Sequence, residues 1–325
     1  MGYFELALGL LFVLAILDLI VGVSNDAVNF LNSAIGSRVA TRRVILLVAG
    51  SGVLAGSLFS SGIMEVARSG IFNPELFVFA DVMVIFLAVM LADVLLLDLF
   101  NTLALPTSTT VSIVFELLGA AVAVAVLTVV GNPDAGAIMD YVRADRALII
   151  ISGIGISIVL AFITGTVVQF FSRLLFTFEQ RNHTAAIRIG WSAVAFTVIS
   201  YFLIIKGLQG VSFVSESVYQ YLSENTLWVS LLALATWTIV MWILNRARVN
   251  LLAIVVLGGT FSLALAFASN DLVNFIGVPL AGLSAWEAWS ASGLPADELR
   301  MEALAGPVRT VRKVERRSEG TTILV

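Results

Sequence analysis

The chain has 325 residues, of which 59% are hydrophobic and 12% are charged, and its 18 basic and 22 acidic residues give a net charge of −4. An ordinary soluble domain carries about 25% charged residues, because polar side chains must cover its surface. The composition therefore predicts an all-α polytopic membrane protein. It excludes a nucleic-acid-binding protein, which needs a basic excess. With no cysteine and one histidine, the chain also lacks the residues for a disulfide framework or a cysteine- or histidine-based metal site.

Apolar segments long enough to cross a bilayer recur along the chain, since a spanning helix needs about 20 apolar residues. Eight such segments occur, at about 3–23, 42–62, 76–98, 106–130, 147–171, 187–207, 227–244 and 251–268. Loops after odd-numbered segments contain more lysine and arginine than the others, which predicts that these loops are cytoplasmic and that the N-terminus lies outside. We expect a multi-pass protein of a plasma membrane or a bacterial inner membrane.

Charged residues become denser near the end of the chain. Twelve of them lie between Ser284 and the last residue, and the preceding 283 positions hold the rest. This distribution predicts a membrane domain over residues 1–283 and a polar tail over residues 284–325.

A seven-residue motif occurs twice, as SNDAVNF at 24–30 and as SNDLVNF at 269–275, with six identical positions at an offset of 245 residues. The first copy follows an odd-numbered segment and the second an even-numbered one, so the copies are predicted to enter the membrane from opposite sides. This pattern is typical of an inverted-topology repeat, which in many secondary transporters places the substrate site on discontinuous helices near the membrane centre. We expect the first repeat over about 1–130 and the second from about 251.

The spacing within each copy brings its polar residues together. On a helix that begins near Ser24, the side chains of Asn25, Asp26 and Asn29 project from one face, and free amides at such a helix start attract anions. Asn-Asp pairs are also typical of a simple turn between two helices. An aspartate at membrane depth costs about 2.5–3.5 kcal/mol, so two of them favour a functional site over a turn.

A second motif, PTSTT at residues 106–110, precedes the apolar segment 111–130. Proline is tolerated at a first helical position, and the hydroxyl residues after it would fill a first turn in which backbone amides are free. Such groups can bind a phosphate oxygen or a desolvated alkali cation. The same pattern is also typical of an ordinary capped helix start.

Together, these motifs resemble those of the PiT family of inorganic phosphate transporters, which carry a G-x-N-D-x-x-N-type and a P-x-S-T-[ST]-H-type signature in each half. The resemblance covers about residues 1–283. It implies that the chain is a symporter of inorganic phosphate with a coupling cation, Na⁺ or H⁺, and that it needs no further cofactor and is not an enzyme.

The resemblance also implies one central site. The residues implied to bind phosphate are Asn25, Asp26, Asn29, Ser108, Thr109, Thr110, Asn270, Asp271 and Asn274. The residues implied to bind the coupling cation are Asn25, Asp26, Ser108, Thr109, Asn270 and Asp271.

The sequence departs from the family pattern after the second SND copy. A second P-x-S-T-T segment is expected there, but the sequence continues into the polar stretch 284–325. A smaller departure is Val111, which replaces the histidine of the signature. These departures motivate an alternative, a phosphate-binding or regulatory membrane component that does not transport.

Two other interpretations stay open, a transporter of another anion such as sulfate and a membrane enzyme that binds Mg²⁺ through paired aspartates. The second has no nucleophile to support it. The sequence also leaves open whether the chain forms a homo-oligomer.

Several acidic residues inside apolar segments lie outside the repeat. Asp18 precedes Asn25 by two helical turns, but Leu263 stands at the matching position before the second copy. For Asp18, and for Asp81, Asp93, Asp98 and Glu116, the sequence favours a helix interface or a cavity wall over the substrate site.

Overall fold

The structure is a computed structural model that describes residues 2–58, 70–132, 135–176, 184–204 and 216–305. Over these ranges the regular structure is helical, with two isolated β-bridges and no strand. The long helices are α1 (Tyr3–Ser37), α2 (Arg42–Leu58), α3 (Phe79–Thr102), α4 (Thr109–Gly131), α5 (Ala144–Leu175), α6 (Ala185–Phe202), α8 (Thr226–Arg246), α9 (Leu251–Asn270) and α10 (Leu272–Ser292). The short helices are η2 (Pro74–Leu76), η3 (Ile138–Tyr141), α7 (Glu216–Glu224) and α11 (Glu302–Ala305).

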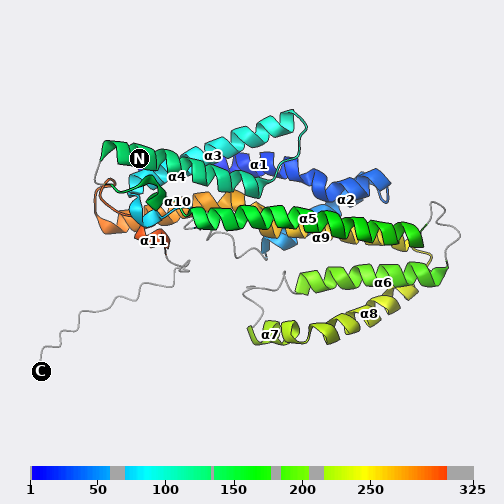
Figure 1. The fold of residues 1–325 in the computed structure, drawn as a ribbon. Coiled ribbons are helices and arrows are strands. Elements are labelled where there is room, and N and C mark those ends of the chain that lie inside the picture. The colour runs from blue at the N-terminus through cyan, green and yellow to red at the C-terminus, as the bar shows by residue number, and fades with distance from the viewer. Residues whose placement is uncertain (1, 59–69, 133–134, 177–183, 205–215, 306–325) are drawn as a thin grey trace, which may run out of the picture.

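The described residues contain seven helical stretches that are long and apolar enough to cross a membrane. Together with the long helices of Figure 1, this count confirms the prediction of a polytopic all-α membrane protein. The predicted number of eight spans is not reproduced. The helix α2 is not among the seven, since its described part has 17 residues, and α9 with α10 forms one stretch, Leu251–Ser292.

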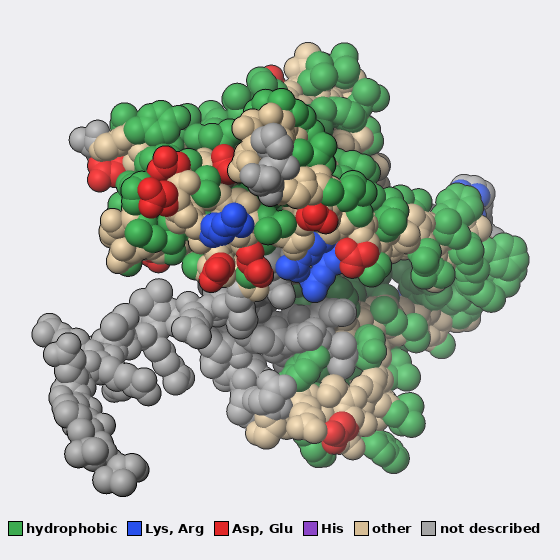
Figure 2. Space-filling model, turned by 60° about the vertical axis from the view of Figure 1, so that its left-hand side comes forward, with side chains coloured by type: hydrophobic (Ala, Val, Ile, Leu, Met, Phe, Trp, Pro, Cys, Tyr) green, Lys and Arg blue, Asp and Glu red, His purple; other side chains and the backbone are tan. Residues whose placement is uncertain are grey.

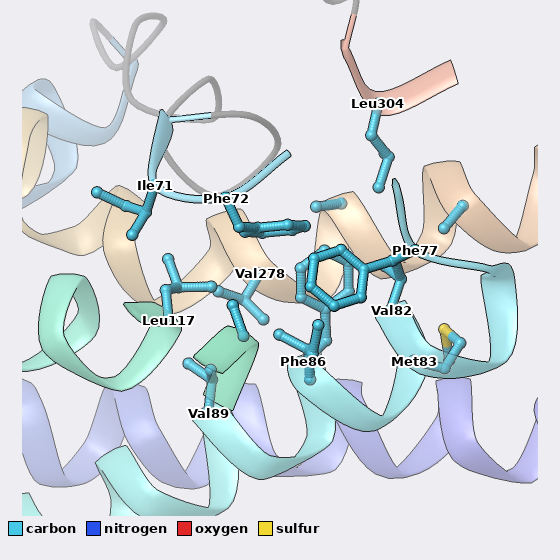
Figure 3. Packing of buried hydrophobic residues seen from close by; sticks show 14 of the residues in the cluster. Ile71, Phe72, Phe77, Val82, Met83, Phe86, Val89, Leu117, Val278 and Leu304 are labelled. Atoms are coloured by element: carbon cyan, nitrogen blue, oxygen red, sulfur yellow. The ribbon is translucent and has the colours of Figure 1, made fainter. Parts of the chain in front are cut away.

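The main core lies where α1, α3, α4 and α10 meet (Figure 3). Phe72, Phe77 and Phe86 are fully buried there, and Leu117 of α4 and Val278 of α10 pack against them. Only 33–44% of the spanning windows of α1, α3 and α4 is buried inside the structure, and exposed apolar side chains such as Leu10, Leu95 and Leu127 make up the other faces. Apolar residues on both the buried and the exposed faces explain why these sequences show continuous apolar runs rather than a narrow apolar stripe.

An irregular cap closes one end of this four-helix core. It is formed by residues 70–78, 135–143 and 293–305, and backbone hydrogen bonds tie its parts together, including Phe79 N–H to Leu299 O (2.8 Å) and Asn73 N–H to Tyr141 O (2.9 Å). Trp289 of α10 stacks on Phe79 at 4.8 Å between ring centroids. Figure 2 shows acidic and basic side chains gathered on this end of the molecule and hydrophobic side chains along its flanks.

The cap changes the predicted boundary at Ser284. That residue lies inside α10, which continues to Ser292, and Met301 and Leu304 beyond it are fully buried. Residues 284–305 are therefore packed onto the membrane helices instead of forming a separate tail. Residues 306–325 lie outside the described part of the chain.

Helix α2 packs closely on α9 through small residues on both helices. A Cβ atom added to Gly52 would lie 3.0 Å from the Ala264 Cβ, and one added to Gly56 would lie 2.8 Å from the Ala268 Cβ; both would also collide with α9 carbonyl oxygens. Small residues four apart let two helices approach in this way. Gly52 and Gly56 are therefore packing residues of the contact between α2 and α9.

We expect the substitution Gly56→Val to destabilise the folded chain by about 1–3 kcal/mol, since overpacking a close interface costs that much. Thermal unfolding of the detergent-solubilised protein measures the loss. Gly50→Val is the matched control on the same helix, because no neighbouring atom lies within 4 Å of a Cβ at that position. Equal melting temperatures for the two variants would contradict the close packing of α2 on α9.

Candidate functional site

The first SND copy lies within one continuous helix. Helix α1 passes through residues 24–30 without a break, and the Ser24 hydroxyl donates a hydrogen bond to the Ile20 carbonyl one turn earlier (2.6 Å). The expectation that a helix begins near Ser24, so that the helices are discontinuous at the first copy, is therefore wrong. Asp26 and Asn29 do lie together on one face of the helix, as their spacing of three residues predicts, because Asn29 Nδ2 donates a hydrogen bond to Asp26 Oδ1 (3.3 Å).

The second copy lies at a junction between two helices. Asp271 is the C-cap of α9 and the residue before α10, so the helix pair α9–α10 is interrupted at the motif's aspartate. The prediction of a discontinuous helix therefore applies to the second copy. Both copies lie in the interior of a long helical stretch, α1 in one case and Leu251–Ser292 in the other.

The PTSTT motif forms the entry to α4. The helix begins at Thr109 with Ser108 as its N-cap, whose side chain accepts a hydrogen bond from the Val111 N–H (3.3 Å). Pro106 lies in the non-helical segment before the cap, so the expectation of a proline at the first helical position is wrong. Thr109 and Thr110 occupy the first turn, as predicted.

Asn25 fastens this segment to α1. Its Nδ2 donates to Asn101 Oδ1 (2.9 Å) and to the Leu105 carbonyl (3.2 Å), and its Oδ1 accepts from the Thr107 N–H (3.1 Å). Asn101 in turn donates to the Val21 carbonyl (2.9 Å). Both amide hydrogens of Asn25 are thus engaged with protein atoms, and this residue holds the PTSTT segment in place.

The single PTSTT motif reaches the aspartates of both SND copies. Thr110 Oγ1 donates to Asp271 Oδ1 (2.9 Å) and accepts from Asn274 Nδ2 (3.0 Å). The neighbouring Thr109, which is buried, interacts with the Asp26 carboxylate. The first turn of α4 therefore lies between the two motif copies and contacts each of them.

A pocket of ≈ 220 Å³ opens between the copies. Asp26 and Asp271 both line it, and they lie close enough for their charges to interact. The remaining lining residues are Asn29, Phe30, Leu263, Ala266, Phe267 and Asn270. Asp26 Oδ2 is buried and has no hydrogen-bond partner among the described residues.

The two copies also contact each other reciprocally. The Phe30 ring of the first copy lies 5.4 Å from that of Phe267, which stands two residues before the second copy. The Phe275 ring of the second copy fills the space that a side chain would need at Gly22, two residues before the first copy. The offset of 245 residues relates the two contacts, and such reciprocity is the property of a two-fold arrangement.

A model of the phosphate transporter family matches residues 22–305. The chain belongs to the phosphate transporter family. Members of this family are transporters and not enzymes, and the seven candidate spans make this member an integral multi-pass membrane protein. The resemblance to phosphate transporters in the sequence is thereby confirmed.

The fold of this family member is similar to that of a solved structure titled "The sodium-dependent phosphate transporter", with a TM-score of 0.59 and 19% sequence identity. The similarity covers 91% of this chain and 71% of the other. A search of curated proteins found no match.

The residues named from the sequence divide into three groups in this transporter-family fold. Asp26, Asn29, Asn270 and Asp271 line the pocket. Thr109 interacts with Asp26, and Thr110 donates a hydrogen bond to Asp271. Asn274 donates a hydrogen bond to Thr110 and so reaches Asp271 through it. Asn25 and Ser108 are engaged in holding and capping the PTSTT segment.

Asn101 is a site residue to which the sequence assigned no role. Its position at the end of α3, where a polar side chain follows a long apolar run, was the available signal. The pairing of Asn101 with Asn25 across α1 and α3 depends on how these helices cross, which a motif does not reveal.

We expect Thr110→Val to lower phosphate uptake about ten- to hundredfold. The substitution keeps the side-chain shape but removes the hydrogen bond to Asp271, and a hydrogen bond to a charged group contributes about 1.5–3 kcal/mol. Uptake of radiolabelled phosphate into proteoliposomes measures the effect.

Two controls accompany this prediction. Thr110→Ser keeps the hydroxyl and should retain most of the uptake. Thr128→Val on the same helix removes a hydroxyl that bonds to the Val124 carbonyl, away from the pocket, and should have little effect. If Thr110→Val and Thr128→Val behave alike, Thr110 has no role at the site.

Proposed function

We propose that the chain carries inorganic phosphate across a membrane by symport with a cation, and that phosphate and the cation bind in the pocket between the two SND copies. The observation that carries the proposal is the pair Asp26 and Asp271, one from each copy, which line the same pocket. The family to which the chain belongs supports phosphate as the substrate.

Charge explains why a cation is needed. None of the helices around the pocket, α1, α3, α4, α9 and α10, contains a lysine or an arginine. An anion in the pocket therefore faces two carboxylates without a basic partner, and two like charges 4 Å apart repel by about 4 kcal/mol at an effective dielectric constant near 20. Phosphate binds there when cations or protons neutralise Asp26 and Asp271.

In this arrangement the binding of phosphate and the binding of the cation are coupled through their charges alone. A cation that raises the affinity for phosphate is bound more tightly, by the same factor, once phosphate is present. In the proposal, the carboxylates hold the cation, and the amide of Asn29 with the hydroxyls of Thr109 and Thr110 completes the binding of phosphate. The similar structure is titled a sodium-dependent phosphate transporter, so Na⁺ is the first cation to test and H⁺ the second.

The reciprocal contacts between the copies support an inverted-repeat arrangement with alternating access. The contacts Phe30–Phe267 and Phe275–Gly22 lie on equivalent positions of α1 and of the pair α9–α10. We infer that these two helical stretches are the cores of two inverted repeats, which move against each other around the pocket.

The experiment is uptake of radiolabelled phosphate by proteoliposomes that contain the purified chain. We expect uptake that requires an inward gradient of Na⁺ or H⁺, and separate imposition of each gradient identifies the ion. Radiolabelled sulfate in place of phosphate tests the anion. Cation-dependent binding of phosphate without uptake under either gradient would contradict transport and would support a phosphate-binding membrane component.

A further inference from the structure

A second group of acidic side chains is buried away from the pocket. Asp18 of α1 and Asp93 of α3 have no exposed surface, and Glu116 of α4 lies beside them. Ser112 of α4, also buried, is the polar residue that joins the group. These four residues lie in the region where α1, α3 and α4 pack, and none of them lines the pocket between the SND copies.

The hydrogen bonds of Ser112 require a proton on a carboxyl group. Its Oγ lies 2.8 Å from Asp93 Oδ1 and 2.7 Å from Glu116 Oε1, and both are hydrogen-bond distances. A serine hydroxyl has one hydrogen to donate and an ionised carboxylate has none. One of the two contacts is therefore made by a protonated carboxyl group that donates to the serine oxygen.

Asp18 provides a second and independent observation. Both of its carboxylate oxygens are buried without a hydrogen-bond partner among the described residues, although it interacts closely with Asp93 and Glu116. Asp93 Oδ2 and Glu116 Oε2 are also unpartnered. As ionised carboxylates these four oxygens could only accept hydrogen bonds, and a bare charge in such buried surroundings is strongly disfavoured.

No basic side chain can neutralise the group from the helices that surround it. Helices α1, α3, α4 and α10 contain neither lysine nor arginine. Their other acidic residues are Glu5, Asp26, Asp81, Asp98 and Glu287. Among the described residues, no group of three acidic or histidine side chains has the arrangement that holds a metal ion. The proton is the cation that the two contacts of Ser112 themselves require.

We propose that Asp18, Asp93 and Glu116 form a proton-binding site that is distinct from the pocket between the SND copies. Protons enter from solution and convert carboxylates to carboxylic acids, which then donate hydrogen bonds to Ser112 or to a neighbouring carboxylate. At neutral pH the site holds at least one proton, the one that the two contacts of Ser112 require. The site goes beyond the proposed function, because it exists whether or not the chain transports phosphate.

The site shares its helices with the phosphate pocket. Asp18 lies two turns before Asn25 on α1, and Ser112 lies two residues after Thr110 on α4. Loss of a proton would leave repelling carboxylates between α1, α3 and α4, the helices that carry the first SND copy and the PTSTT motif. The proton site is therefore placed where it can influence the position of these two motifs.

Infrared difference spectroscopy of the reconstituted full chain tests the proposal. A protonated carboxyl group has a carbonyl band separate from that of a carboxylate, and this band shifts in D₂O. At neutral pH we expect the spectrum of the wild type to contain such a band that the triple variant Asp18→Asn, Asp93→Asn, Glu116→Gln lacks, with an intensity of at least one carboxyl group per chain. Asp98→Asn, which replaces an exposed acid on α3, should leave the band unchanged.

A second variant keeps the test decisive if the triple variant fails to fold. Ser112→Ala retains all three acids but removes their shared hydroxyl, so it should shift the frequency of the band without removing it. A wild-type spectrum without a protonated carboxyl band that depends on these residues would overturn the proposal. Because the readout needs neither phosphate nor transport, its failure is distinguishable from failure of the proposed function.

Discussion

Replacement of either SND aspartate by asparagine is expected to reduce cation-driven phosphate uptake about 100-fold or more. The variants Asp26→Asn and Asp271→Asn keep the side-chain volume but remove the charge that binds the cation. Loss of a charged partner costs about 3 kcal/mol, and each 1.4 kcal/mol corresponds to a factor of about ten. Because the two residues occupy the same position of the two SND copies and line one pocket, we expect similar losses from the two substitutions.

Initial rates of phosphate uptake into proteoliposomes measure this effect at fixed cation gradients. Asp98→Asn is the matched control, since Asp98 is an exposed acid on α3 and does not line the pocket. Uptake that remains cation-dependent at wild-type rates in both Asp26→Asn and Asp271→Asn would refute the assignment of the site.

The second large effect is expected for Gly22→Val. A side chain at this position collides with the Phe275 ring, so the two SND copies can no longer pack together. Overpacking of this kind costs about 1–3 kcal/mol, and displacement of the second copy also moves Asp271 away from Asp26. We therefore expect a lower melting temperature together with nearly complete loss of uptake.

Gly9→Val on the same helix separates this effect from the general cost of a valine in α1, because no atom lies within 4 Å of a Cβ at Gly9. The double variant Gly22→Val, Phe275→Leu relieves the collision and should recover part of the melting temperature. If Gly22→Val is as stable and as active as Gly9→Val, the reciprocal packing of the copies does not support the site.

The sequence predicted several of the long apolar helices, because apolar length indicates where a helix can span, but it missed α10 (Leu272–Ser292) and ended the first segment well before the end of α1 at Ser37. The predicted segments 76–98 and 227–244 differ from α3 and α8 by a few residues. The helix start predicted near Ser24 was wrong, since an Asn-Asp pair fits both the interior of a helix and its start. The structure shows which applies through the Ser24 hydrogen bond to the Ile20 carbonyl.

Side-chain contacts between helices that are far apart in the chain could not be predicted from the sequence. The motifs identified Asp26 and Asp271, but not that Thr110 of one hydroxyl segment bonds to Asp271 while its neighbour Thr109 contacts Asp26. The association of Asp18 with Asp93 is of the same kind, because it depends on how α1 crosses α3 and leaves no signal in either helix alone. The polar composition after Ser284 likewise concealed the cap that residues 293–305 form with residues 70–78.

The central claim is that one pocket between the SND copies binds phosphate and a cation together. The most direct measurement is equilibrium binding of radiolabelled phosphate to the purified chain over a range of Na⁺ concentrations and pH values, with the variant Asp26→Asn, Asp271→Asn in parallel. We predict that the affinity of the wild type rises with the coupling cation and that the affinity of the double variant does not depend on it. A wild-type affinity for phosphate that is the same at every Na⁺ concentration and pH would contradict the claim.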